Sequence, residues 1–185
     1  LWSTLAGLRW LGLEWDEGPS IRGLSDEDLQ PLPDESYNDY LTRLNLSAGS
    51  GEHGPYFQSQ RLSLYSNAIG ELLDKGAAYH CYCSPEELKS RREELEARKG
   101  DSRYDGRCRD LTPEREQVLR EEGRRPAVRF LMPKEGVTAW DDVVRGYTEF
   151  QNSELEDLVL QKSDGFPTYN FAVVIDDALM EITHV

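Results

Sequence analysis

Apolar side chains recur at the spacing of an α-helix in three stretches of the chain. The first stretch predicts the end of an amphipathic helix that stops near Gly12. The second, residues 58–75, is followed by Gly76, a residue that favours the left-handed conformation after a helix end. The third predicts one short helix inside residues 20–53. The apolar positions are, in order: Trp2, Leu5, Leu8, Trp10 and Leu11; Leu62, Tyr65, Ile69, Leu72 and Leu73; Tyr37, Tyr40, Leu41, Leu44 and Leu46.

The middle of the chain alternates between charged helices and short strands. Ser84 and Glu87 have the spacing of a capping box, which predicts a helix that runs to about Lys99. A second charged helix is expected at residues 112–122. Strands are expected at residues 77–82, 127–132, 138–144 and 159–162. Mixed elements of this length indicate a compact α/β insertion.

Residues 162–179 allow two interpretations. A turn at residues 163–165 precedes Pro167, which fits the first position of a helix, and the apolar residues Phe171, Val174, Ile175 and Leu179 would form its inner face. The β-branched run at residues 172–175 favours a buried strand equally. A helix beginning here would direct N–H groups at whatever Thr168, Tyr169 and Asn170 face, a suitable place for a carboxylate. A buried tyrosine in a core helix explains the same residues.

Length and composition describe an ordinary globular protein of one domain with an insertion, or of two small domains. The chain has 185 residues, of which 38% are apolar and 30% charged. No apolar run reaches the length of a membrane span, and no secretory signal is visible, so no membrane partner is expected. Because the chain opens on Leu1 rather than methionine, we expect an excerpt, with any targeting peptide upstream.

The net charge of −14 argues against a general nucleic-acid binder, because phosphate contacts depend on Lys and Arg. A basic surface on one side remains possible. Three local pairs of arginines could build such a surface, or they could be solvated charges among equally frequent glutamates: Arg91 with Arg92, Arg107 with Arg109, and Arg124 with Arg125.

The three cysteines have a spacing typical of a metal site: Cys81-x-Cys83, then Cys108 after 24 intervening residues. Thiolates suit Zn²⁺, which takes four ligands in a tetrahedron, so one position is left for another donor. The alternative is three reduced cysteines packed in an intracellular domain with no metal.

Five sequence blocks, in this order along the chain, resemble glutamyl-tRNA synthetases of bacterial and organellar type. They are L-R-W-L-G-L-E-W-D-E-G-P (residues 8–19), G-P-Y-F-Q-S-Q-R (54–61), Y-D-G-R-C-R (104–109), N-S-E-L-E-D (152–157) and S-D-G-F-P-T-Y-N-F-A-V-V-I-D-D-A-L-M-E-I-T-H-V (163–185). The resemblance covers most of the chain.

The resemblance implies an α/β fold that is part of a class I synthetase. Residues 1–80 would belong to the Rossmann-like nucleotide-binding domain, with residues 20–53 as an acidic insertion loop. Residues 81–166 would form an inserted mixed α/β domain that binds the acceptor stem and holds the zinc site. Residues 167–185 would return into the catalytic domain.

The resemblance also implies the activity: ATP-dependent activation of glutamate to glutamyl-adenylate, followed by transfer to tRNA(Glu). ATP and Mg²⁺ would serve the complete enzyme, a monomer in the cytoplasm or in a mitochondrial or plastid matrix. The family's ATP-binding signatures, H-x-G-H and K-M-S-K-S, are expected outside this chain. The chain should therefore hold no catalytic residue and be inactive alone.

Particular residues match the family's binding sites. Tyr169 matches the tyrosine of the glutamate pocket, and Asn170 is its neighbour. Lys162 and Arg61 match positions near tRNA, although capping and salt bridging explain Arg61 equally well.

The fourth zinc ligand in the family is either a histidine two residues after the third cysteine or a tyrosine four residues before it. Asp110 stands at the histidine position and Tyr104 at the tyrosine position. The resemblance therefore implies a structural zinc ion held by Cys81, Cys83, Tyr104 and Cys108, with Asp110 as the alternative fourth ligand.

Two other functions fit parts of the pattern. One is the related enzyme that glutamylates queuosine in tRNA(Asp), which shares the cysteine spacing but usually differs at P-T-Y-N-F-A. The other is a non-catalytic, zinc-stapled interaction module. That module would predict a parent chain without either ATP-binding signature.

Overall fold

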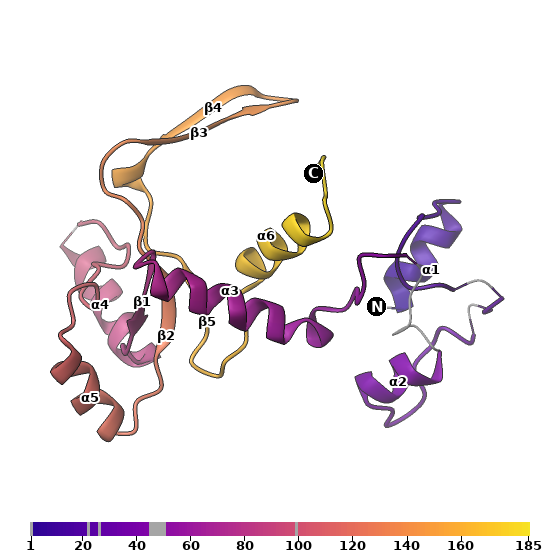
Figure 1. Ribbon diagram of the computed structural model, residues 1–185, viewed down its shortest axis with the longest axis horizontal. Coiled ribbons are helices and arrows are strands. Elements are labelled where there is room, and N and C mark those ends of the chain that lie inside the picture. The colour runs from indigo at the N-terminus through magenta and orange to yellow at the C-terminus, as the bar shows by residue number, and fades with distance from the viewer. Residues whose placement is uncertain (1, 22, 26, 45–50, 99) are drawn as a thin grey trace. The chain divides into compact units, whose positions relative to one another are not determined.

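The structure is a computed structural model that describes residues 2–21, 23–25, 27–44, 51–98 and 100–185 (Figure 1). The chain divides into two compact units. The first comprises residues 1–64 and 174–185, and the second comprises residues 65–173. No helix in the described part of the chain is long and apolar enough to cross a membrane.

The first unit contains two of the predicted helices. Helix α1 is Trp2–Trp10, and Gly12 follows it with a φ of 70°, so the predicted stop is confirmed. Helix α2 is Tyr37–Arg43, and the Ser36 side chain accepts the amide hydrogen of Asp39 at its start. Leu46, predicted to belong to this helix, lies outside the described residues. The core of the unit consists of Leu5, Ile21, Leu29, Tyr40, Leu41, Leu44 and Phe57.

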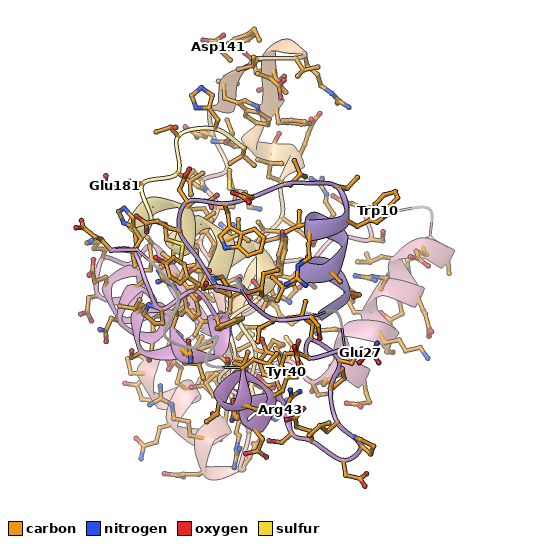
Figure 2. All side chains as sticks on the ribbon, turned by 90° about the vertical axis from the view of Figure 1, so that its right-hand side faces the viewer. Trp10, Glu27, Tyr40, Arg43, Asp141 and Glu181 are labelled. Carbon is orange, nitrogen blue, oxygen red and sulfur yellow. The ribbon has the colours of Figure 1, made fainter. Side chains whose placement is uncertain are left out.

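Part of the acidic interval after residue 20 is therefore packed rather than loose. The Tyr40 hydroxyl donates to the carbonyl of Leu29 at 2.7 Å, and Leu29 is fully buried. Arg43, next to Tyr40 on α2 (Figure 2), donates to the Glu35 carboxylate at 2.6 Å and to the carbonyl of Asp28 at 3.0 Å. These bonds fold the loop back on α2. Whether this interval is an insertion stays a prediction.

Helix α3 confirms the predicted helix but begins later. Residues Gln58–Gln60 form a single 3₁₀ turn, and α3 is Leu62–Asp74. At its end the amide of Gly76 donates to the carbonyl of Leu73, and the amide of Ala77 donates to that of Leu72. Gly76 has a φ of 65°, which completes a Schellman motif.

A three-stranded antiparallel sheet with the order β1-β2-β5 organises the second unit. The strands are β1 (Ala78–Cys81), β2 (Ala127–Phe130) and β5 (Val159–Gln161), all within the predicted intervals. Helices α4 (Pro85–Ala97) and α5 (Pro113–Glu121) connect β1 to β2 (Figure 1). Ser84 and Glu87 form both bonds of the predicted capping box.

A separate hairpin contains a strand that the sequence analysis missed. It pairs β3 (Val137–Asp142) with β4 (Gly146–Gln151), where only the first strand was predicted. Trp140 and Phe150 stack across the pair with ring centroids 5.8 Å apart. Most residues of both strands are exposed. A strand without a buried face needs no alternation of apolar and polar residues, so the sequence of β4 contained no strand signal. A short 3₁₀ turn, Asn152–Glu154, follows.

The predicted domain boundaries differ from the compact units. A boundary after residue 80 would cut β1, because Cys81 still pairs with Ala127 of β2. The second unit instead begins at Tyr65, inside α3. Its end lies at Val173, seven residues after the predicted end of the inserted domain at residue 166. The functional meaning given to each predicted segment stays a prediction.

Helix α6, Tyr169–Leu179, decides between the two interpretations of the C-terminal stretch in favour of a helix. The placement of Pro167 at the first helical position was wrong. Pro167 instead forms an isolated bridge with Gln161, and the helix starts two residues later. The expected inner face is only partly covered: Phe171 is buried, whereas Val174 is 62% exposed.

Candidate metal centre and helix α6

The three cysteine sulfurs come together at the end of β1. Cys81 is the last residue of that strand, Cys83 lies just before α4, and Cys108 comes from the turn that precedes α5. All three Sγ atoms lie within 4.8 Å of one another, and those of Cys83 and Cys108 are 3.6 Å apart. Among the residues that the structure describes, this is the only such group of potential metal ligands.

The Tyr104 hydroxyl completes the group with an oxygen. It lies 3.4 Å from the Cys81 sulfur and 3.9 Å from the Cys83 sulfur, and it accepts the amide hydrogen of Cys108 at 3.2 Å. Around tetrahedral zinc, bond lengths of about 2.3 Å to sulfur and about 2.0 Å to oxygen separate two sulfurs by about 3.8 Å and a sulfur from an oxygen by about 3.5 Å. The observed spacings match this donor set.

Asp110, the alternative fourth ligand, does not join the group. It is exposed, and its carboxylate is not among the clustered ligand atoms. The reason is local: Cys108 turns its side chain into the cluster, whereas Asp110, two residues further on, faces solvent before the Thr112 cap of α5.

The cluster favours a thiolate at Cys81. Hydrogen bonds from Cys108 and Cys83 hold the pKa of the Cys81 thiol well below its usual range. Hydrogen bonds with Cys108 and Cys81 raise the pKa of Cys83, and burial raises that of Tyr104. One negative charge therefore gathers here readily, and a divalent cation would stabilise the further thiolates that a zinc site requires.

A buried ion pair supports the loop that carries Cys108 and Tyr104. Asp157 is 1% exposed and accepts a hydrogen bond from Arg109 Nε at 2.6 Å, a second from its Nη2, and one from the Tyr79 hydroxyl at 2.5 Å. Burial opposes ionisation of Asp157, but the bonds from Arg109 and Tyr79 outweigh it and lower its pKa. Sequence reasoning missed this pair, although Arg109 and Asp157 each close one of the five matching blocks.

Arg129 was also missed, and it lies against the candidate ligands. It is 7% exposed on β2, its guanidinium carbon lies 3.8 Å from the centre of the Tyr104 ring, and its Nη1 donates to the carbonyl of Asp157 at 2.7 Å. Burial alone would lower the pKa of Arg129, but hydrogen bonding and attraction to Cys81 raise it. The signal available in the sequence was an arginine between Val128 and Phe130 of an otherwise apolar strand.

The residues expected to meet glutamate lie at the first turn of α6. Tyr169 is 73% exposed, and Asn170 beside it is exposed as well. Lys162 lies in the preceding turn, where its amine contacts the Asp164 carboxylate at 2.9 Å and approaches the Phe166 ring to 5.6 Å. These side chains are accessible to a ligand from solvent.

Arg61, expected near tRNA, is buried instead. Its side chain is 2% exposed, its Nε donates to Asp176 at 2.7 Å, and its Nη1 donates to the carbonyl of Pro55 at 2.9 Å. No guanidinium surface is left for a phosphate contact in this arrangement. The structure therefore favours the salt-bridging explanation of Arg61.

At least one arginine of each pair has an acidic partner. Arg91 contacts Glu94 and Asp105, Arg107 contacts Asp105, and Arg124 contacts Glu87. With Arg109 bound to Asp157, these contacts favour the interpretation as balanced charges over that of a basic surface.

Cys108 of the cysteine cluster and the exposed Tyr169 at the start of α6 each belong to one of the five sequence blocks. Residues 2–185 match the family described as the catalytic domain of the class I tRNA synthetases for E and Q, and the chain belongs to this family. The α/β fold class and the resemblance found in the sequence are both confirmed.

Similar proteins agree on one specificity. The chain is 45% identical over 184 residues to a glutamate–tRNA ligase of Heliobacterium modesticaldum and 42% identical over 181 residues to that of Elusimicrobium minutum. These alignments cover 99% and 97% of this chain but 31% and 32% of the relatives. The chain thus spans about a third of their length.

Solved structures give the same result. A glutamate tRNA ligase from Elizabethkingia meningosepticum, crystallised in complex with its amino acid, superposes with a TM-score of 0.72 at 32% identity. The superposition covers 98% of this chain and 32% of that one. The glutamate–tRNA synthetase of Elizabethkingia anophelis matches to the same extent.

Proposed function

We propose that this chain is part of an enzyme that ligates glutamate to tRNA(Glu) in an ATP-dependent reaction through glutamyl-adenylate. The observation that carries the proposal is the similarity over nearly the whole chain to proteins named glutamate–tRNA ligase, at 42–45% identity for the two relatives above. The parts that bind ATP and Mg²⁺ would be supplied by sequence outside this chain. Catalysis in such an enzyme rests on positioning and charge stabilisation.

The first turn of α6 would recognise glutamate. The exposed Tyr169 hydroxyl is available to hydrogen-bond the amino acid, with Asn170 beside it. The amide groups at the start of the helix add a partial positive charge that favours a carboxylate. Lys162, on the adjoining turn, would make a phosphate contact with the acceptor end of tRNA, exchanging its exposed pair with Asp164 for a phosphate.

The cysteine cluster would hold a structural zinc ion through Cys81, Cys83, Cys108 and Tyr104. Spacings that match a tetrahedron support this assignment. With four protein ligands the ion would keep no position for water, so it would act on folding rather than on chemistry. It would fasten the loop between β1 and α5 in the acceptor-binding part of the enzyme.

The test of the glutamate site uses the complete enzyme. Tyr169→Ala should raise the Michaelis constant for glutamate roughly tenfold or more in aminoacylation of tRNA(Glu), since a hydrogen bond to a charged substrate contributes about 1.5–3 kcal/mol. Tyr147→Ala is the matched control, because this hairpin tyrosine is 65% exposed but lies outside the proposed pocket. Unchanged kinetics for Tyr169→Ala would refute the assignment.

The test of the metal site is elemental analysis of the purified chain. We expect about one equivalent of zinc, lost in Cys81→Ser and retained in His80→Ala, a neighbour on β1 outside the cluster. Less than about half an equivalent in the unmodified chain, with no change in Cys81→Ser, would contradict a site of this kind.

A further inference from the structure

We propose that Arg129 is the counter-ion of the metal–thiolate centre and the residue that positions Tyr104 as its oxygen ligand. This inference rests on the zinc site proposed above. It concerns a side chain that belongs to none of the five matching sequence blocks and that binds no metal itself.

The position of Arg129 in the sheet brings it to the cluster. It lies on the central strand β2 directly opposite Tyr79 of β1, two residues along that strand from Cys81. Its side chain is 7% exposed, and the guanidinium carbon lies 3.8 Å from the centre of the Tyr104 ring. The cation and the aromatic face are therefore in contact inside the protein.

A cation at this depth needs an anion, and no carboxylate provides one. In the part of the chain that the structure describes, no ion pair joins Arg129 to an aspartate or glutamate within 4.0 Å. Asp157 gives Arg129 only its backbone carbonyl at 2.7 Å, since its carboxylate is bound by Arg109. The Arg129 Nε atom is buried without a hydrogen-bond partner. An isolated buried charge is strongly unfavourable.

The thiolate cluster is the anion that balances this charge. Three thiolates around one divalent cation carry one net negative charge, and a single guanidinium neutralises it. Cys81 lies on the neighbouring strand β1, two residues from Tyr79, which stands opposite Arg129. With the metal bound, the charges of the cluster and of Arg129 therefore sum to zero, and no surface residue is needed to balance them.

The same contact orients the fourth ligand. The guanidinium lies over the face of Tyr104 and holds the ring, and the amide of Cys108 donates to its hydroxyl at 3.2 Å. Together these contacts keep the oxygen 3.4 Å from the Cys81 sulfur. Groups that orient a metal ligand from outside typically change metal affinity 10–100-fold when they are removed.

The test compares two substitutions that separate charge from hydrogen bonding. Arg129→Gln removes the charge and keeps a donor for the Asp157 carbonyl, whereas Arg129→Lys keeps the charge. Zinc affinity of each purified chain is measured by competition with a chromophoric chelator. We expect the dissociation constant to rise roughly 10–100-fold in Arg129→Gln and to stay within about tenfold of the original value in Arg129→Lys.

A control variant and a second measurement distinguish an effect on the metal site from a general loss of structure. Arg125→Gln removes an exposed arginine just before the same strand and should leave zinc affinity unchanged. In Co²⁺-loaded protein, Arg129→Gln should alter the visible ligand-field bands, because the oxygen ligand shifts, while Arg125→Gln should not. A purely structural arginine elsewhere in the core would not change these bands.

The outcomes distinguish the two proposals. If the unmodified chain binds no zinc, the metal site fails and the role of Arg129 falls with it. If the unmodified chain binds zinc and folded Arg129→Gln binds it equally well, only the counter-ion role is overturned. Should Arg129→Gln not fold, Arg129→Lys decides: affinity within about tenfold supports the role of charge, and a loss beyond about 100-fold in the folded protein refutes it.

Discussion

Two parts of the chain that lie in the same family match each contain a residue at an opposite extreme of exposure. The blocks Y-D-G-R-C-R and N-S-E-L-E-D meet inside the second unit, where Asp157 is 1% exposed. The block that contains T-Y-N-F-A presents Tyr169, which is 73% exposed. Sequence blocks that match one family can therefore be buried in one place and exposed in another.

Both parts contain a carboxylate paired with a cation, so the contributions of the two pairs to stability can be compared. Asp157 is enclosed by Arg109, Tyr79 and the amide of Met132. Asp164 pairs with Lys162 at 2.9 Å while both side chains remain more than half exposed. Solvent screens the exposed pair but not the buried one, so the two should differ severalfold in their effect on stability.

The largest effect is expected for Asp157→Ala. Removal of this carboxylate leaves Arg109 without its partner in a buried site, and we expect the free energy of unfolding to fall by about 3–5 kcal/mol. The matched variant Asp164→Ala should cost about 1 kcal/mol or less. Urea unfolding followed by circular dichroism measures both, and equal losses in the two variants would remove the contrast.

Arg61→Met tests a buried arginine that sequence reasoning had placed on the surface. Asp176 would lose the hydrogen bond from Arg61 Nε at 2.7 Å, so we expect a loss of about 3 kcal/mol in the same unfolding measurement. A stable Arg61→Met variant whose complete enzyme binds tRNA(Glu) more weakly would restore the original assignment of Arg61 to the tRNA surface.

The contribution of ionised Asp157 to stability should be visible in the pH dependence of unfolding at low pH. Its native pKa is lowered, so its contribution is complete above the unfolded pKa of about 3.9 and is lost as the pH falls through the lower native value. The free energy of unfolding should therefore decrease less steeply below about pH 4 in Asp157→Asn than in the unmodified chain. An equally steep decrease of the free energy of unfolding with falling pH in the two proteins would contradict this.

The smallest effect is expected for the stability of Tyr169→Ala. An exposed side chain away from the core contributes little, so the free energy of unfolding should change by less than about 0.5 kcal/mol. Thermal or urea unfolding of the purified chain measures it. A loss comparable to that of Asp157→Ala would show that Tyr169 supports the fold and would assign it to the scaffold.

Local signals in the sequence predicted much of the fold. Gly76 ended α3, Ser84 and Glu87 capped α4, and the spacing of Cys81, Cys83 and Cys108 indicated a cluster. Each of these signals depends on residues close together in the chain or on a ligand spacing that a metal itself imposes.

The features that were missed depend on pairings that the local sequence pattern does not show. Arg109 and Asp157 are 48 residues apart, and nothing local to either one reveals the pair. Ile21 and Leu29 enter the core from irregular chain with no periodic pattern. Pro167 would suit a helix start equally well in isolation, but pairing with Gln161 held it in an extended bridge. Tertiary structure decided each of these cases.

The hairpin of β3 and β4 has a consequence for how the protein behaves at high concentration. A two-stranded sheet has an open edge on each side, and its tip carries Val143 and Val144 at 95% and 93% exposure. Acidic side chains on the strands, such as Asp141 (Figure 2), and the net charge of −14 make copies repel one another at neutral pH. Near the isoelectric point of 4.6 this repulsion vanishes, so edge-to-edge association should limit solubility there.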